Sequence, residues 1–404
     1  MLKGKNVVLA VTGSIAAYKI ANLASLLMKQ HCKVTVLMTK NATNFIHPIT
    51  FETLTGNKCL IDTFDRSFQY SVEHVSLAKE TDLIMVAPAS ANVIAKLAHG
   101  IADDMLTTTI LACECPKLVA PTMNTHMYHN PIVQDNIKQL KRYGMKVIKP
   151  DTGYLACGDI GEGKMPSEEI LLSYIIKYIA YEKDLKGKKV MVTAGPTREA
   201  LDPVRFISNH STGKMGYAIA KDCMLRGAEV TLITGPTTIK TPDFVKVIPV
   251  VSAQDMFMAV KDNFMEQNII IKAAAVSDYR PVNVAEEKVK KTENDITLAL
   301  EKTTDILQFL GDHRIRGQIL CGFSMETENM VENSRKKLEK KKADLIIANN
   351  LKVEGAGFGT DTNIVTLLTK DEENLLPLLS KKQIAHMIMD KILEIEKKQK
   401  GTCI

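Results

Sequence analysis

A glycine and a serine follow the first apolar run of the chain and are placed to bind a phosphate. The run Val7–Val11 reads as a buried strand, and Gly13-Ser14 stands where the next helix, continuing to Lys29, should begin. Free backbone N–H groups at a helix start bind anions, and the Ser14 hydroxyl adds a further donor. We therefore expect an anion site in this turn.

Small and charged residues far along the chain could handle a triphosphate and a metal ion. The apolar run 269–274 ends in Ala273, Ala274 and Ala275, then Asp278, and the basic segment Lys288–Lys291 comes soon after. A carboxylate can hold a divalent cation or act as a base, and an ammonium group can neutralise a departing phosphate. These residue types favour nucleotide chemistry.

Two further lysines, Lys337 and Lys341, lie four residues apart in a helix predicted from Thr327 to Lys342. That spacing puts both side chains on one helix face. They could bind phosphate, although such a basic run is also typical of a solvated helix.

His74, Asn124 and Cys157 are candidate catalytic residues of the first half. A histidine can act as a base near neutral pH, and an amide can hold a carboxylate without adding a charge. Cys157 stands in a glycine-rich stretch, which suits a lid that carries a thiol. Each has a plain structural alternative: a surface histidine, a cap at a strand end and a small buried hydrophobe.

The elements that must position these residues occur in two similar series. Leu2–Gly13 and Leu185–Gly195 each combine a basic approach, an apolar run and a glycine, and the segment 180–184 separates the two series. We predict two domains, residues 1–183 and 186–404, in the α/β class: doubly wound sheets, Rossmann-like or flavodoxin-like, in tandem. Other predicted strands are 34–38, 83–86, 117–120, 190–194, 229–233, 319–323 and 345–348.

Composition narrows the possible functions. The 404 residues are 45% hydrophobic and 24% charged, which is ordinary for globular domains, and the net charge of +6 is too mild to favour nucleic-acid binding. The eight cysteines show no CxxC spacing, so we expect neither a disulfide framework nor a zinc site, and a reducing cytoplasm fits. No apolar run reaches the roughly 18 residues of a membrane helix.

Two common nucleotide-binding classes are disfavoured. Gly213-Lys214 lacks the P-loop pattern, because Met215 stands where Ser or Thr should bind magnesium. An NAD-dependent oxidoreductase is also disfavoured, because the GxGxxG fingerprint is missing and Thr39 ends the second strand where an acidic residue should bind ribose.

The first half resembles the flavin-containing cysteine decarboxylases. The shared motifs are GSIAAYK, His74, PASAN after 83–86, PxMNxxM after 117–120 and the glycine-rich segment 153–165, although Tyr128 replaces the usual Trp. The resemblance implies a trimer with FMN between subunits and catalysis by His74, Asn124 and Cys157. It implies that FMN contacts Gly13, Ser14, Thr39, Ser90, Ala91 and Thr108.

The implied chemistry explains why a flavin is needed. A cysteine carboxylate joined through an amide has no electron sink for loss of CO2, and flavin oxidation of the thiol-bearing carbon would create one. A proton donor must then assist reduction of the resulting enethiol. The resemblance gives that task to Cys157, with His74 as base or charge partner and Asn124 holding the carboxylate.

The second half resembles the phosphopantothenate–cysteine ligases through VTAGPTRE, DPVRFISNxSTGKMG, AAAVSDYRP and KxKK. This implies attack of 4'-phosphopantothenate on CTP, then displacement of CMP by cysteine. Asn209 would stabilise the acyl cytidylate, Lys288 would assist its conversion, and Asp278 would hold Mg2+ or Mn2+. CTP would contact Ala273, Ala274, Ala275, Asp278, Lys288, Thr303, Thr304, Asp305, Ile306, Phe323, Lys337 and Lys341.

Together the two resemblances imply a bifunctional, cytoplasmic lyase and ligase of coenzyme A biosynthesis. The ligase product would be the substrate of the decarboxylase, which would yield 4'-phosphopantetheine. The partners would be small molecules and other copies of the chain, with neither nucleic acid nor membrane: a trimer-forming first domain and a dimer-forming second would combine to a dodecamer. The alternative is a regulatory FMN-binding protein of the same fold without catalysis.

Overall fold

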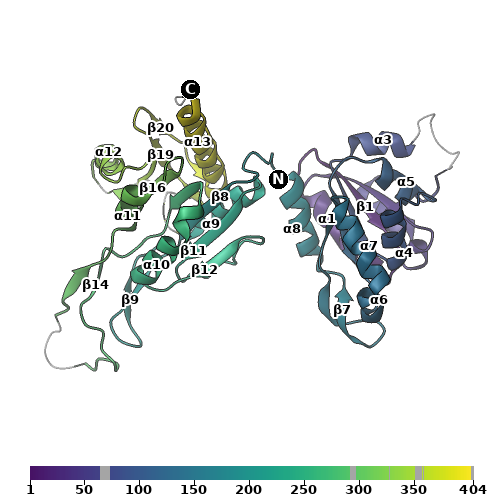
Figure 1. Ribbon diagram of the computed structural model, residues 1–404, viewed down its shortest axis with the longest axis horizontal. Helices are drawn as coiled ribbons and strands as arrows, with labels where there is room; N and C mark the ends of the chain where they lie inside the picture. The colour runs from purple at the N-terminus through teal and green to yellow at the C-terminus, as the bar shows by residue number, and fades with distance from the viewer. Residues whose placement is uncertain (64–72, 292–296, 327, 351–356, 358, 402–404) are drawn as a thin grey trace. The chain divides into compact units, whose positions relative to one another are not determined.

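The computed structural model describes residues 1–63, 73–291, 297–326, 328–350, 357 and 359–401. Thr327, where we predicted a helix to begin, and Cys403 lie outside the described residues. The chain divides into two compact units, Met1–Tyr181 and Glu182–Ile404 (Figure 1).

The first unit is built on a five-stranded parallel sheet of order β2-β1-β3-β4-β5, as in flavodoxin-like folds. The order reverses between β1 and β3, so the loops after these strands border the crevice where such sheets bind ligands. The strands are β1 (Asn6–Val11), β2 (Lys33–Met38), β3 (Leu83–Ala89), β4 (Lys117–Pro121) and β5 (Lys146–Val147).

Helices cover both faces of this sheet because its strands are apolar on both sides. Val7 and Leu9 of β1 pack in one core with α1 and α8, whereas Val8 and Ala10 pack in the other core with α4, α5 and α7. The helices are α1 (Ala17–Lys29), α2 (Pro48–Thr55), α3 (Glu73–Glu80), α4 (Ala91–His99), α5 (Met105–Ala112), α6 (Thr125–His129), α7 (Pro131–Arg142) and α8 (Glu168–Ile179). A hairpin of β6 (Asp151–Tyr154) and β7 (Ile160–Lys164) stands outside the sheet.

The second unit contains an eight-stranded sheet of order β12-β11-β8-β13-β16-β17-β19-β20. Its first six strands are parallel and follow the 3-2-1-4-5-6 order of Rossmann folds, with the crevice between β8 and β13. The strands are β8 (Lys189–Ala194), β11 (Glu229–Thr234), β12 (Lys246–Pro249), β13 (Ile269–Lys272), β16 (Ile319–Glu326), β17 (Leu345–Asn350), β19 (Val365–Leu368) and β20 (Glu373–Leu375).

The predicted doubly wound class is confirmed for both sheets, with one unpredicted addition. The strands β19 and β20 extend the second sheet in antiparallel pairing, so β17 lies inside the sheet. Short strands outside the sheet pair as β9 (Arg198–Ala200) with β10 (Phe206–Ser208), β14 (Tyr279–Pro281) with β15 (Leu300–Lys302), and β18 (Thr362–Asn363) with β21 (Leu379–Ser380). Figure 1 shows β9 and β14 on an arm that extends away from this sheet.

Helices also cover both faces of the second sheet. The helices α10 (Ala253–Asn263), α11 (Ile306–His313) and α12 (Met330–Lys340) share a core on one face. On the other side of the sheet, α9 (Lys214–Leu225) packs on β8 and β11, and the long C-terminal helix α13 (Lys381–Gly401) packs on α9.

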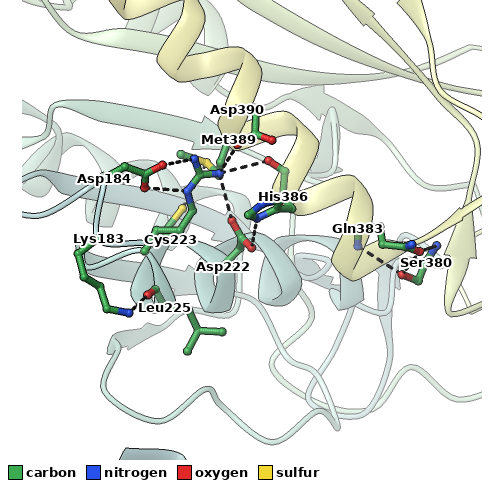
Figure 2. Close-up of polar contacts among 11 residues, drawn as sticks. Lys183, Asp184, Asp222, Cys223, Leu225, Ser380, Gln383, His386, Met389 and Asp390 are labelled. Carbon is green, nitrogen blue, oxygen red and sulfur yellow. Dashed lines mark hydrogen bonds and ion pairs between the residues drawn. The ribbon is translucent and has the colours of Figure 1, made fainter. Parts of the chain in front are cut away.

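A buried guanidinium joins α9 to α13 (Figure 2). Arg226, at the end of α9, forms ion pairs with Asp184 at 2.5 Å and with Asp390 of α13 at 2.7 Å. His386 of α13 lies 3.1 Å from the buried Asp222. Burial raises the pKa of the Asp222 carboxyl, and the nearby His386 and Arg226 only partly oppose this. The cluster therefore depends on Arg226 to balance several carboxylates.

Candidate active sites

The first unit has a cavity of about 380 Å³ beside the start of α1. Three residues expected at one site, Ser14, Asn124 and Cys157, all line it. The full lining is Ser14, Ile15, Ala16, Tyr18, Lys19, Thr122, Met123, Asn124, Tyr154, Leu155, Ala156, Cys157, Gly163, Lys164 and Met165.

The hairpin of β6 and β7 brings Cys157 to this cavity. Its tip is closed by two backbone bonds, in which Leu155 N donates to Asp159 O at 2.8 Å and Gly158 N donates to Leu155 O at 3.0 Å. Gly158 has a φ of 93°, which suits glycine in so tight a turn. At the base of the hairpin, Met123 N donates to Gly163 O at 3.1 Å, and a Cβ on Gly163 would meet Met123 O at 2.2 Å. This close approach fixes the hairpin beside Asn124.

Asn124, Cys157 and Asp159 form one polar cluster. The Asn124 amide donates to Asp159 Oδ2 at 2.8 Å and contacts Cys157 Sγ at 3.2 Å, while Cys157 Sγ lies 3.3 Å from the same carboxylate oxygen. Asn124 also caps α6, because its Oδ1 accepts from His126 N at 2.8 Å. The sequence analysis did not predict Asp159, although a carboxylate two residues after the candidate thiol was a usable signal.

His74 does not lie with this cluster in the same chain. It is half-buried on α3, it is not among the residues that line the cavity, and α3 packs against α5. Figure 1 shows α3 and β7 at opposite ends of the first unit. Thr108, another predicted site residue, lies on α5 and is therefore also on the α3 side. Within one chain, His74 therefore does not line the cavity that Asn124 and Cys157 share. The resemblance, which implies FMN between subunits, does not require that it should.

The remaining predicted flavin contacts lie at the carboxyl ends of β1, β2 and β3. Gly13 packs so closely that a Cβ would meet Asn41 Cβ at 2.8 Å, and Thr39 is buried with its hydroxyl accepting from Ala42 N. Ala91 is the first residue of α4, directly after Ser90. Apart from Ser14, none of the residues predicted to contact FMN lines the cavity described above.

These residues fit a flavin phosphate by their hydrogen-bonding chemistry. Ser14 Oγ accepts from Ala16 N and Ser90 Oγ accepts from Val93 N, so each hydroxyl keeps its own hydrogen to donate. Thr12 ties the two loops together, because its hydroxyl donates to Pro88 O at 2.7 Å and accepts from Ser90 N at 2.9 Å. The donors therefore converge on the crevice between β1 and β3.

The second unit has a cavity of about 440 Å³ toward the carboxyl ends of β13, β16 and β17. It unites the predicted residues Asn209, the three alanines, Asp278, Phe323 and Lys337. The full lining is Asn209, Ser211, Thr212, Gly213, Lys214, Met215, Gly216, Lys272, Ala273, Ala274, Ala275, Val276, Asp278, Phe323, Ser324, Met325, Lys337, Asn349, Gly357, Asn363 and Lys381.

Glycines allow the segment before α9 to form one wall of this cavity. Gly213 caps α9 with a φ of 81°, and a Cβ there would meet Thr237 Cγ2 at 2.9 Å and Gly195 Cα at 3.3 Å. A Cβ on Gly216 would meet Ala194 Cβ at 2.6 Å, so α9 lies directly against the end of β8. Asn209 is held on this wall because its amide donates to Ala275 O at 3.0 Å.

Lysines from two elements meet at the other side of the cavity. Lys337 donates to Phe323 O at 3.0 Å, and Lys341 forms an ion pair with Asp305 at 2.6 Å. Lys337 therefore points toward β16 and Lys341 toward the start of α11, so these two side chains have partners within the protein. Lys272 joins them from β13, and burial together with the charge of Lys337 lowers the pKa of Lys272 to about 8.

Several predicted ligands of CTP do not line the cavity. Lys288 is exposed in the segment between β14 and β15, beside Val289, whose N–H donates to Asp202. Thr303 donates to Ser277 O at 2.6 Å, so it lies next to Asp278. The other predicted contacts outside the lining are Thr304, Asp305, Ile306 and Lys341, at or near the ends of α11 and α12.

A metal ion at Asp278 would need ligands from a bound substrate. The Asp278 side chain lines the cavity, and within the described ranges no group of three His, Cys, Asp or Glu residues could hold a metal ion. Magnesium is often bound by one or two carboxylates together with substrate phosphates, so a single carboxylate still fits that kind of site.

Both units are similar to known protein families. The family profile described as Flavoprotein matches residues 1–180, and the profile described as DNA/pantothenate metabolism flavoprotein C-terminal domain matches residues 185–395. The coenzyme A biosynthesis bifunctional protein CoaBC of Bacillus subtilis is 46% identical over 401 residues, which is 98% of each chain. The chain belongs to the family of bifunctional coenzyme A biosynthesis proteins.

A second relative agrees with this membership. The Haemophilus influenzae protein of the same name is 42% identical over 393 residues, covering 97% of this chain and 98% of that protein. A crystal structure of the C-terminal domain of a CoaBC protein is 46% identical, covers 53% of this chain and 100% of that chain, and has a TM-score of 0.46.

As a member of this family, the protein is a bifunctional enzyme of coenzyme A biosynthesis with decarboxylase and ligase activities. It is a flavoprotein, and its flavin is FMN. The alternative of a regulatory protein without catalysis is not favoured. None of the helices in the described part of the chain is long and apolar enough to cross a membrane.

Proposed function

We propose that residues 1–183 carry the FMN-dependent decarboxylase and residues 186–404 carry a CTP-dependent ligase. The ligase joins cysteine to 4'-phosphopantothenate, and the decarboxylase converts the product to 4'-phosphopantetheine. The observation that carries this assignment is the contact of Asn124 with Cys157 at 3.2 Å beside the Ser14 turn. An amide and a thiol are placed together there for a carboxylate substrate.

In the decarboxylase, bound FMN would accept electrons from the thiol-bearing carbon and return them after loss of CO2. Ser14 and Ser90 would donate to its phosphate, with Gly13, Thr39, Ala91 and Thr108 as further contacts. Asn124 holds the substrate carboxylate with the amide that now donates to Asp159. The Cys157 thiol supplies a proton at the reduction step, and His74 serves as base or charge partner for the oxidation.

The separation of His74 from Cys157 within one chain supports a site shared between copies. The α3 end of one first unit would lie against the β6–β7 hairpin of another, so neither half of the site would act alone. We therefore propose a homo-oligomer: a trimer through the first unit and a dimer through the second, which combine to a dodecamer. The exposed apolar side chains Ile15 and Tyr18 at the cavity edge suit such a contact.

In the ligase, the substrate carboxylate attacks the α-phosphate of CTP, pyrophosphate leaves, and the cysteine amine displaces CMP. Asn209 stabilises the acyl cytidylate with an amide that already faces the cavity. Lys337 and Lys341 neutralise charge at the nucleotide, and Lys288 assists conversion of the intermediate. Phe323 offers a ring for stacking on a base.

Asp278 would hold Mg2+ or Mn2+ together with the phosphates of CTP. The neighbouring Ala273, Ala274 and Ala275 leave room for the nucleotide beside the strand end. Thr303, Thr304, Asp305 and Ile306 complete the contacts that we assign to CTP. Thr303 lies close to the metal position, because its N–H donates to Asp278 O at 2.9 Å.

The assignment is tested by incubating the purified full-length protein with 4'-phosphopantothenate, cysteine and CTP. We expect pyrophosphate and then CO2, followed separately. Asn209→Ala should lower pyrophosphate-coupled amide formation by about a hundredfold or more, because a positioned donor to the reacting phosphate is lost. Decarboxylation of supplied 4'-phosphopantothenoylcysteine should continue unchanged. Loss of both activities in this variant would contradict the division between the two units.

A further inference from the structure

The ammonium group of Lys272 lies at the second cavity without a hydrogen-bonding partner. No hydrogen bond or ion pair joins Lys272 to any residue within the described ranges, although it is half-buried and lines the cavity. Lys337 and Lys341 differ, because a carbonyl and a carboxylate accept from them. Partial burial of an ammonium group without a hydrogen-bond acceptor costs free energy. A bound ligand that offers an acceptor atom to Lys272 would offset this cost.

The strand register directs Lys272 toward the helices that border the nucleotide. Ile270, two residues earlier, packs in the core with Leu307 of α11 and Leu338 of α12. Alternate residues of a strand share one face, so Lys272 emerges on this face at the cavity. Its partner on β16 is Gly322, where a Cβ would meet Leu307 Cδ2 at 2.8 Å. Glycine at this position therefore lets α11 pack closely against the sheet beside Lys272.

We propose that Lys272 binds the nucleotide directly, by donating from its ammonium group to an acceptor atom of CTP. This rests on the proposed function of the second unit. The charges that act most strongly on Lys272 are those of Lys337, Lys341, Asp278 and Asp305. Lys214, which is paired with Asp361, and Lys381 also line the cavity. Three cations near two carboxylates favour an added anion or a polar acceptor. Phosphate oxygens and the carbonyl of a pyrimidine share this acceptor chemistry.

The site should therefore bind CTP in a manner that depends on pH. Since the pKa of Lys272 is about 8 rather than 10.5, this ammonium loses its proton at a lower pH than an ordinary lysine. The charged form is the donor, so CTP affinity should fall by up to about tenfold per pH unit above the pKa of Lys272. Lys272→Arg keeps a charge that does not titrate in this range and should remove the dependence.

The experiment measures CTP binding to the full-length protein by titration calorimetry, near neutral pH and about one to two units above the pKa of Lys272. Lys272→Met should raise the Kd near neutral pH about ten- to hundredfold, as expected for loss of a hydrogen bond to a charged group. Lys336→Met is the matched control, because Lys336 is on α12, exposed and paired with Glu332 at 2.7 Å. Its Kd should equal that of the wild type.

Binding of cytidine, which has no phosphate, shows which acceptor atom of CTP Lys272 contacts. If Lys272 donates to the base, Lys272→Met weakens cytidine binding as well; if it donates to phosphate, cytidine binding stays unchanged while the binding of CTP weakens. Equal CTP affinity in the wild type and in Lys272→Met overturns the role of Lys272 and leaves the CTP-dependent ligase intact. A wild-type protein that binds no CTP overturns both.

Thermal unfolding shows whether each variant is folded and gives a second readout. Below pH 8 Lys272 is charged in both the folded and the unfolded state, and only the folded state bears the cost of burial. Lys272→Met should therefore raise the unfolding midpoint of the second unit at low pH, and the gain should fade between pH 8 and 10.5. If the Met variant does not fold, Lys272→Arg still tests the proposal. The proposal is overturned if the CTP affinity of Lys272→Arg falls with rising pH as steeply as that of the wild type.

Discussion

At the scale of single residues, the surroundings of Cys157 fit the proton donor that we propose and differ from those of a core thiol. Its sulfur is exposed at the hairpin tip and contacts Asp159 and Asn124. Cys32 and Cys59 are buried in the core instead, and burial raises the pKa of the Cys32 thiol to about 11 and that of the Cys59 thiol to about 12. A thiol whose proton is held by a carboxylate suits the late protonation step of the decarboxylation.

Cys157→Ser should lower decarboxylation by about a hundredfold or more, because a positioned acid is replaced by a much weaker one. FMN should stay bound and the flavin absorbance that substrate bleaches should fail to recover, as stopped-flow spectra would show. Cys59→Ala is the control, since Cys59 is buried away from the cavity. Normal recovery of the flavin absorbance in Cys157→Ser would remove this thiol from the mechanism.

At the scale of elements, the second cavity depends on glycines that let loops pass close to one another. A Cβ on Gly235, directly after β11, would meet Pro196 O at 1.8 Å. Pro196 belongs to the loop after β8 and forms a bridge with Ala275 at the cavity. The loop after β11 therefore packs against the loop that is bridged to Ala275, a residue of the cavity lining.

Gly235→Ala should destabilise the second unit by about 1–3 kcal/mol, because the added methyl group must displace backbone. It should also reduce ligase activity through the shifted loop, while decarboxylase activity remains. Calorimetric unfolding and the two separate assays measure these effects. Gly401→Ala, at the end of α13 with no atom within 4 Å of its added Cβ, should change neither. A Gly235→Ala protein of unchanged stability would contradict the close packing.

The sequence predicted these elements well where a strand is fully apolar and ends in small residues. The runs at 7–11 and 190–194 became β1 and β8, whereas β13 stops at Lys272, two residues before its predicted end. Alanines alone do not stop a strand; here the chain leaves the sheet because the loop after β13 turns back to Pro196. The strands β19 and β20 were missed because they are only four and three residues long and lack the strict alternation of apolar and polar residues that indicates a strand.

Site residues were predictable where motifs supply the side chain locally, as for Asn124 and Cys157. Lys272 and Asp159 were not predicted. The surroundings of Lys272 are formed by segments that are distant along the chain, and the contact of Asp159 with Cys157 depends on the turn at the hairpin tip. His74 and Lys288 were predicted by resemblance, but no local pattern could show that they lie outside the cavities of their own chain. Such positions depend on tertiary and quaternary arrangement.

At the scale of the whole molecule, a shared decarboxylase site predicts complementation between inactive chains. His74→Ala and Cys157→Ser should each lose decarboxylase activity alone, and a co-expressed mixture should recover part of it, because some sites would combine the two intact halves. The ligase activity of each chain serves as the internal standard. A mixture that stays inactive, although sedimentation shows mixed oligomers, would mean that each chain builds its own site.

The ion pairs of Arg226 show that the C-terminal helix α13 is part of the packed second unit. Residues 381–401 form no loose tail, since Asp390 and His386 meet buried groups on α9. Shortening the protein before Lys381 would leave a guanidinium without one counter-charge and uncover the sulfur of Cys223, which contacts Met389. Recombinant versions trimmed for crystallisation should therefore keep this segment, and affinity tags belong beyond residue 401.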